Sequence, residues 1–407
     1  MHWLTSVLVV SFWLVATFPL DAFAQMDDNT SEGPSHGLAT RVARLEAQVE
    51  ALGAQVEALE GVLAQTDARV EAMETALTQA QTILQFVRVE AGPIDRLAGP
   101  HWIIEGANVH VRSGSGSTDD GCAVDDSHCE NLTGLGNLVV GYNEPDQSVF
   151  PFLRTGSHNL VIGPEHGYSS FGGFVTGRRN RVSGPLSSIS GGISNRAIGT
   201  FSSVGGGSNN VASGNESSVS GGGNNEASGR ASWVSGGLGN DASGRDSSVI
   251  GGWVNEASGR MASVTGGWGN VASGDRSVVS GGFSNDATGN NSSVSGGASN
   301  EASGTASSVS GGFGNEASGG SSSVSGGTVN EASDVHSSVS GGYINKARGV
   351  ASSVSGGFYN VASGSRSTVN GGQFNVASGE FSSVSGGRKR TAPSDDNWAA
   401  GSLLEPN

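Results

Sequence analysis

A strict repeat of 15 residues constrains the fold of this chain more than any other feature of the sequence. An asparagine recurs at this interval from Asn180 to Asn375, and a Gly-Gly pair recurs in step with it from 191 to 386. The repeated unit reads N-x-A-S-G-x-x-S-S-V-S-G-G-x-x. Self-similarity at a fixed short period is typical of solenoids, in which each unit forms one turn that stacks on the next.

Each repeat contains two short stretches in which apolar and polar residues alternate, for example 210–214 and 217–221. Because successive side chains of a strand point to opposite faces, Ala212 and Val219 fall on the inner face and their serine neighbours on the outer face. The glycines that follow each stretch permit a sharp reversal of the chain. The unit therefore predicts two short strands folded back to back, with alanine facing valine.

We accordingly predict an all-β solenoid, a parallel β-roll of about 14 turns over residues 180–387, preceded by an α-helical coiled coil. Successive turns would lie about 4.8 Å apart, with the asparagine amides stacked in a ladder at one corner. One alanine and one valine per turn bury little apolar surface, which predicts that several rolls associate laterally. The predicted core columns are represented by Ala212, Val219, Ala227, Val234, Ala242, Val249, Ala257 and Val264.

The composition narrows the range of functions. The 407 residues include 67 glycines, only 14% are charged, and the net charge is −16. An acidic chain without a basic stripe is unsuited to binding nucleic acid. A repeat of serine, glycine and alanine offers no asymmetric pocket, and the histidines lack the spacing of a metal site. We therefore predict neither an enzyme nor a bound metal or cofactor.

The N-terminal residues predict export. Residues 4–20 are nearly all apolar, and the Ala-Phe-Ala sequence at 22–24 fits a signal-peptidase site, so residues 1–24 are predicted to be a signal peptide. An uncleaved anchor helix is the alternative. The polar leader 25–37 is predicted to be disordered. We expect a secreted or cell-surface protein with no integral membrane segment after removal of the signal.

A heptad pattern follows the leader. Apolar residues alternate at spacings of four and three from Leu38 to Val87, which predicts a coiled coil over residues 38–90. Valine at most a positions and leucine at d positions favour two strands. A long amphipathic helix packed on its own domain is the alternative. A coiled coil needs partner helices, so the heptads predict a homo-oligomer.

Residues 91–179 are predicted to form a β-rich transition that caps the first turn. Cys122 and Cys129 lie in an Asp-rich loop, and in an exported protein they are predicted to form a disulfide. A metal clip with His128 is the alternative.

Irregular loops on a regular scaffold often bind ligands. Phe150 and Phe152 are therefore candidate contacts, or parts of the cap. Residues 388–407 break the repeat and are predicted to cap the last turn, with Trp398 covering it.

The variable position after each Gly-Gly pair is often bulky. Equivalent positions stack turn on turn, so these side chains predict a stripe along one edge of the solenoid. The stripe is either a binding surface for carbohydrate, matrix protein or another surface, or a contact between neighbouring rolls. Its members are Leu238, Trp253, Trp268, Phe283, Phe313, Tyr343 and Phe358.

The position after each asparagine is often acidic, as at Glu226 and Asp241. Like charges at strand spacing repel one another, and Arg230, Arg245 and Arg260, four residues further along, are predicted to offset the repulsion. A solvated face is the simpler interpretation, and a cation-binding ladder is the alternative.

The repeated unit closely resembles, over 180–387 and loosely over 137–179, the head repeats of trimeric autotransporter adhesins. The resemblance implies a left-handed parallel β-roll, three rolls side by side in a homotrimer, and a role in adhesion. Two features differ. Those adhesins end in a membrane-anchor β-barrel segment, which the C-terminal residues here do not resemble. Their stalk usually follows the head, whereas here the heptads precede the repeats.

Three functions are compatible with these patterns. The first is a fibrous adhesin-like or structural protein that attaches to a host, matrix or surface carbohydrate or protein, or assembles a surface layer. The second is a non-catalytic solenoid that binds polysaccharide or ice, with outward serines such as Ser218 and Ser220 ordering water. The third is a carbohydrate-active enzyme, for which 15 residues per turn and the lack of a close carboxylate pair are unfavourable.

Overall fold

The computed structural model describes residues 34–94, 96–124, 129–145 and 153–401. The chain divides into two compact units, Met1–Val109 and His110–Asn407. The predicted signal peptide, residues 25–33 of the leader, and both Phe150 and Phe152 lie outside the described residues.

The first unit contains one long helix, α2 (Pro34–Leu84). It begins at a proline, which suits the first helical position because its missing N–H is not needed there. Leu45, Leu59 and Leu77 on the heptad seam are 57–60% exposed. The helix is compatible with a coiled coil, and the large apolar side chains of its seam are exposed. No helix among the described residues combines the length and hydropathy needed to cross a membrane.

The helix ends earlier than the heptads predict. Strand β1 (Val87–Glu90) pairs antiparallel with β2 (His101–Ile104), with Val87 opposite Ile104. Val87, the last apolar residue of the heptad pattern, therefore belongs to a hairpin. The alternation of Val87 and Val89 around Arg88 suits a strand, and Arg88 forms an ion pair of 3.1 Å with Glu90.

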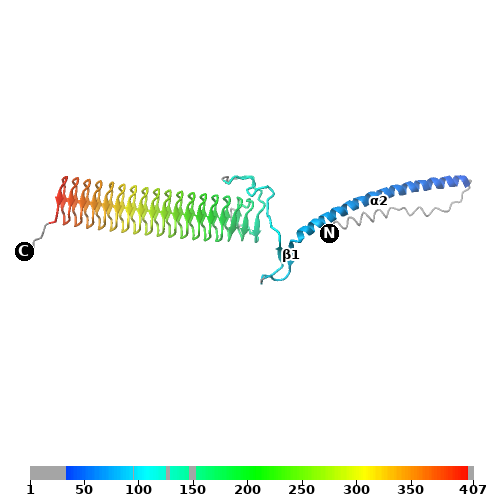
Figure 1. The fold of residues 1–407 in the computed structure, drawn as a ribbon, viewed down its shortest axis with the longest axis horizontal. Helices are drawn as coiled ribbons and strands as arrows, with labels where there is room; N and C mark the ends of the chain where they lie inside the picture. Colours follow the sequence, from blue (N-terminus) through cyan, green and yellow to red (C-terminus); the bar gives the residue numbers. More distant parts are fainter. Residues whose placement is uncertain (1–33, 95, 125–128, 146–152, 402–407) are drawn as a thin grey trace, which may run out of the picture. The chain divides into compact units, whose positions relative to one another are not determined.

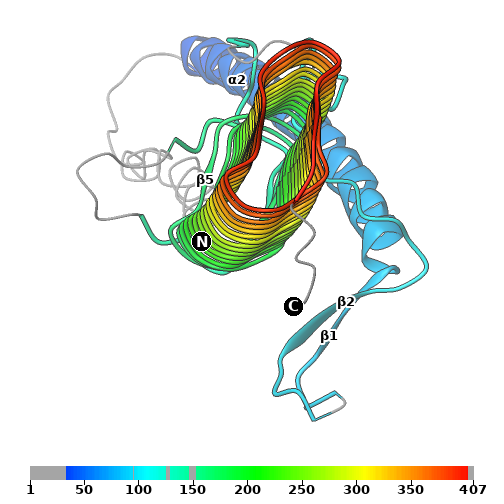
Figure 2. The same cartoon turned by 90° about the vertical axis from the view of Figure 1, so that its left-hand side faces the viewer.

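The second unit is a parallel β-solenoid with two sheets (Figure 1). In Figure 2 the turns superpose along the stack. We call the two sheets the Val sheet and the Ala sheet after their inward residues. The Val sheet consists of β3 (Leu138–Val140), β4 (Leu160–Ile162), β6 (Phe174–Thr176), β8 (Ser188–Ile189), β10 (Ser203–Val204), β12 (Ser218–Val219), β14 (Trp233–Val234), β16 (Ser248–Val249), β18 (Ser263–Val264), β20 (Val278–Val279), β22 (Ser293–Val294), β24 (Ser308–Val309), β26 (Ser323–Val324), β28 (Ser338–Val339), β30 (Ser353–Val354), β32 (Thr368–Val369), β34 (Ser383–Val384) and β36 (Trp398–Ala399).

The Ala sheet has 16 strands, and every strand of either sheet pairs with the equivalent strand of the next turn. It consists of β5 (Gly167–Tyr168), β7 (Arg181–Val182), β9 (Arg196–Ala197), β11 (Val211–Ala212), β13 (Glu226–Ala227), β15 (Asp241–Ala242), β17 (Glu256–Ala257), β19 (Val271–Ala272), β21 (Asp286–Ala287), β23 (Glu301–Ala302), β25 (Glu316–Ala317), β27 (Glu331–Ala332), β29 (Lys346–Ala347), β31 (Val361–Ala362), β33 (Val376–Ala377) and β35 (Thr391–Ala392).

The alanine and valine columns face each other inside the solenoid, as the alternation predicts. The side chains at the eight named core positions, from Ala212 to Val264, are at most 1% exposed. The register is fixed at one repeat per turn, since Val219 pairs with Val234 and Ala212 with Ala227.

The solenoid has about 16 turns, somewhat more than predicted. The additional turns lie at both ends. Upstream of Asn180, the strands β4, β5 and β6 pair into the stack although their spacing is irregular. Downstream, 388–401 forms a further turn instead of a separate cap, and Trp398 pairs with Ser383 and is 66% exposed. Pro393 in this last turn has no N–H to offer another strand, a feature that blunts sheet edges.

The repeated asparagine is buried at the corner before each Ala-sheet strand. Its Oδ1 accepts the backbone N–H of the next asparagine, as between Asn225 and Asn240 at 3.0 Å. Its Nδ2 donates to two glycine carbonyls, for Asn225 those of Gly221 at 2.9 Å and Gly237 at 3.0 Å. The predicted amide-to-amide ladder exists along 255–300, with Nδ2 to Oδ1 distances of 3.0–3.3 Å. Along the whole column, bonds to backbone groups join the turns.

His166 occupies the asparagine position in an early turn. Its Nδ1 accepts the backbone N–H of Asn180 at 3.2 Å, and its Nε2 donates to the carbonyl of Ile162 at 3.0 Å. These contacts assign the neutral tautomer with the proton on Nε2. Burial lowers the pKa of this fully buried side chain. A neutral imidazole thus replaces the asparagine amide.

Asn225→Ala should destabilise the solenoid by about 2–4 kcal/mol, because it leaves the buried N–H of Asn240 and the carbonyl of Gly221 without partners and removes one of the two donors to the carbonyl of Gly237. Ser232→Ala is the matched control, since the Ser232 hydroxyl is buried without a hydrogen-bond partner in the described structure and Ala262 occupies the same column naturally. Urea unfolding followed by circular dichroism measures both. Equal midpoints for the two variants would contradict the role of the asparagine column.

Acidification should destabilise the early turns through His166. Its pKa is lower in the folded chain than in the unfolded chain, so the unfolded chain binds the extra proton and stability falls as the pH drops through about 6.5. His166→Asn keeps both kinds of hydrogen bond and should remove this loss. His336→Asn, at an exposed turn position, is the control. The measurement is the melting temperature at pH 7 and pH 5, and an unchanged pH dependence in His166→Asn would contradict the assignment.

Candidate functional site

The residues after each Gly-Gly pair form one column along the edge of the solenoid. Single-residue parallel bridges join Leu238 to Trp253, Trp253 to Trp268, and Trp268 to Phe283, and the same column continues through Phe313, Tyr343 and Phe358. Leu238, the least exposed of the first six predicted members, is 40% exposed, Phe313 is 55% exposed, and Phe358 is half-buried. The structure therefore places all seven predicted residues on one accessible edge.

The aromatic rings of this edge form two clusters. The ring centroids of Trp253 and Trp268 are 5.6 Å apart and stacked, and Phe283 meets Trp268 edge-on at 5.2 Å. Further along, Tyr343 stacks on Phe358 at 5.4 Å. Ala298 and Thr328 stand in the column between the clusters, on either side of Phe313.

The second cluster includes two residues that the sequence analysis does not single out. Tyr359 and Phe374 occupy the position after the column, and their rings stack at 5.4 Å. Tyr359 also meets the edge of Phe358 at 4.6 Å. The repeat alignment could have identified them, because both follow a bulky or polar residue of the column at the same spacing. The aromatic edge is therefore wider near the C-terminal turns.

Between residues 187 and 374, all formal charges lie on one half of the solenoid surface. From 187 to 374, the residues from the buried serine through the Gly-Gly pair to the next asparagine include no Asp, Glu, Lys, Arg or His. This half, which we call the uncharged side, comprises the outer face of the Val sheet and the aromatic edge. In a chain of net charge −16 this segregation is visible in the sequence, as a repeated run of uncharged residues from the buried serine to the asparagine. Interface cores are depleted of charge in the same way.

The acidic residues form a column on the outer face of the Ala sheet. Asp241 pairs in register with Glu226 on one side and Glu256 on the other. Burial and then these two carboxylates raise the pKa of Asp241 to about 6. The structure contains no cluster of potential metal ligands within the described residues.

The predicted arginine compensation is wrong. Arg230 pairs with Glu216 at 3.1 Å, and Arg245 pairs with the adjacent Asp246 at 3.2 Å. The four-residue spacing crosses the Ser-Gly turn, so these arginines lie on a different edge from the acidic column. The column instead ends in a cationic pair, where hydrogen bonds from Arg348 and Lys346 lower the pKa of Glu331 to about 2.

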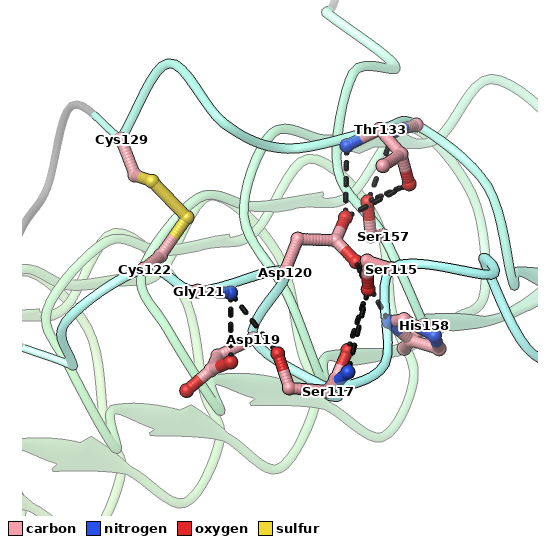
Figure 3. Close-up of a disulfide and its surroundings, with 11 residues drawn as sticks. Ser115, Ser117, Asp119, Asp120, Gly121, Cys122, Cys129, Thr133, Ser157 and His158 are labelled. Carbon is pink, nitrogen blue, oxygen red and sulfur yellow. Dashed lines mark hydrogen bonds and ion pairs between the residues drawn. A yellow bond between two sulfur atoms is a disulfide. The ribbon is translucent and has the colours of Figure 1, made fainter.

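The loop before the first turns contains the disulfide. Cys122 and Cys129 are bonded, with 5.7 Å between their Cα atoms. Next to it, the buried Asp120 accepts hydrogen bonds from Ser113 at 2.8 Å and from both the N–H and the hydroxyl of Thr133 at 2.8 Å (Figure 3). Burial raises the pKa of Asp120, but these bonds and those of neighbouring serines outweigh it, so the pKa lies well below its ordinary value. The carboxylate organises the loop.

His158 lies beside this carboxylate. Its Nε2 accepts the backbone N–H of Ser113 at 3.1 Å, and its Nδ1 lies 4.0 Å from an Asp120 oxygen. The contacts of Ser113, Asp120 and His158 connect the loop to the solenoid without placing an activated nucleophile. The alternative metal clip involved His128, which lies outside the described residues.

A scan of protein-family models finds no family that matches the chain, and a search of curated proteins finds no relative.

Two substitutions in the acidic column should have opposite effects on stability at pH 7. Asp241→Asn should stabilise the fold, because the folded pKa of about 6 exceeds the unfolded value, and the gain should disappear as the pH falls from 6 to below 4. Glu331→Gln should destabilise it at pH 7, with the loss disappearing between pH 4.5 and 2. Thermal melts across pH 2–7 measure both, and shifts of the same sign would contradict the charge assignments.

Proposed function

We propose that this chain is a secreted or cell-surface fibrous protein, adhesin-like or structural in kind, that attaches or assembles through its repetitive solenoid. The observation that most supports this proposal is the uncharged side of the solenoid. Like-charged copies of a chain with net charge −16 approach with least repulsion through the half of the surface that has no charges. The proposed role is non-catalytic and needs no cofactor.

The uncharged side is large enough for a lateral contact between sister chains. At about 4.8 Å per turn, the stretch from 187 to 374 spans roughly 60 Å. Its outward side chains number roughly fifty, more than each partner of a standard interface contributes. The outer face of the Val sheet is formed mostly by serines, as at Ser308 and Ser310, and these short side chains leave the face flat. The Val sheets of two chains can therefore approach each other closely.

The exposed seam of α2 supports the same assembly. Its leucines and valines need partner helices to be buried, and parallel helices would hold sister solenoids in register. The resemblance to autotransporter adhesin heads favours three copies and left-handed rolls. Export by residues 1–24 would deliver such a fibre to the cell surface or the medium.

Polysaccharide binding is a second candidate function. The row of half-exposed rings at Trp253, Trp268 and Phe283 favours it, because rings in mutual contact form a continuous apolar edge against which sugar rings can pack. The same row favours polysaccharide over ice as the ligand. An ice-binding surface would use only the columns of serine hydroxyls, and the aromatic rings would have no role in it.

Sedimentation equilibrium of the chain from residue 25 onward tests lateral assembly. A Ser308→Glu/Ser338→Glu variant adds charge to the uncharged side and should shift the protein toward monomer. Ser303→Glu/Ser333→Glu, at half-buried serines of the acidic face in the same turns, is the matched control and should leave the oligomer intact. A monomeric parent protein, or equal effects of both variants, would contradict the proposal.

A further inference from the structure

Two arginines without acidic partners lie on adjacent rungs of the Ala sheet. Arg181 of β7 and Arg196 of β9 are paired in register on the outer face. Within the described residues no carboxylate lies at ion-pair distance from either side chain, whereas the neighbouring Arg178 and Arg179 both pair with Glu165 at 2.9 and 3.3 Å. The chain has 37 acidic and 21 basic residues, and these two arginines lie side by side without a carboxylate between them. Burial and then Arg196 lower the pKa of Arg181, so its environment favours an added anion.

Arg181 lines a groove of about 630 Å³. One wall is formed by Arg181 of β7 and by the residues that directly follow β5, β7 and β9, including Ser183. The other is formed by the disulfide loop from Cys129 to Leu132 together with Leu153 and Thr155. Ser169, Ser170 and Phe171 also line it. Its volume lies within the ordinary range of small-ligand sites.

The groove is held open by fixed contacts. The disulfide ties Cys129 to Cys122, and Asp120 fixes the chain that follows through Thr133. The Thr200 hydroxyl donates to the carbonyl of Val124 at 3.2 Å, which fastens the loop to the side of the solenoid. A site built from such supports binds its ligand with little loss of conformational entropy.

We propose that this groove binds a carboxylate-bearing saccharide, such as a uronate, with the carboxylate on Arg181 and with the charge of Arg196, on the adjacent strand, adding to the attraction. The planar guanidinium fork matches a carboxylate with two parallel hydrogen bonds. The hydroxyls of Ser169, Ser183 and Thr155 suit the hydroxyls of a sugar ring, and Leu132 and Leu153 provide an apolar wall. Exposed Glu130 at the rim opposes the anion and weakens binding. The site does not depend on the proposed assembly, because it lies on the charged side of the early turns.

Isothermal titration of the chain from residue 25 onward with glucuronate tests this site, with glucose and inorganic sulfate as the comparison ligands. Glucuronate should bind saturably and more tightly than either. Arg181→Gln should weaken it at least tenfold, and Glu130→Gln should tighten it. Arg230→Gln is the matched control, since Arg230 is exposed and paired with Glu216 outside the groove.

Titration with a short oligoglucuronate shows whether the ligand is a polymer chain or a free sugar acid. A short oligoglucuronate that binds as well as the monomer indicates a site open to polymer chains, and one that fails to bind indicates a free sugar acid; both support the proposal. If Arg181→Gln does not fold, Ser183→Asp places a competing carboxylate in the groove and should abolish binding. No glucuronate binding, equal binding of glucose, equal binding of sulfate, or unchanged binding in Arg181→Gln and Ser183→Asp would overturn it. Each of these results is independent of the oligomeric state.

Discussion

The side-chain amide of the repeated asparagine joins each turn of the solenoid to the next. It supplies an acceptor for a buried N–H of the following turn and donors for two glycine carbonyls at a corner where strand pairing stops. Buried backbone groups must find such partners, and here one side chain per turn supplies three of them. The glycines make this possible: at Gly222, with φ of +84°, a Cβ would lie 2.2 Å from the carbonyl oxygen of Gly237. The asparagine and glycine therefore fix the repeat at 15 residues per turn. This spacing places the alanine and the valine on the inside of every turn.

The regular part of the fold can be predicted from the sequence because every turn repeats the same pattern of residues. Alternation around Ala212 and Val219 places these side chains inside, and both are buried. The ends are not predictable in the same way. The first turns change their spacing between β3, β4 and β6, and the last turn has Arg390 in place of asparagine and Ser394 in place of glycine. Backbone pairing with a well-formed neighbouring turn holds these segments in place despite the altered residues.

The candidate surfaces also differ in whether the sequence predicts them. The aromatic edge is predictable because its members share one position of the repeat. The groove lined by Arg181 cannot be predicted in this way. It forms between residues 129–132 and residues 181–198, and no local sequence pattern indicates that these segments meet. The predicted offset of the acidic column by Arg230 fails for a related reason, since sequence distance across a turn does not measure distance in space.

Charge segregation connects the fold to the proposed assembly, because turns with small cores gain additional burial when their uncharged sides meet. Backbone hydrogen exchange at two protein concentrations tests this most directly. We expect the amides of the central turns, from 240 to 330, to lose protection when the protein is diluted below the concentration at which the copies dissociate. Strong protection that is independent of concentration, in a protein shown to be monomeric, would contradict the account.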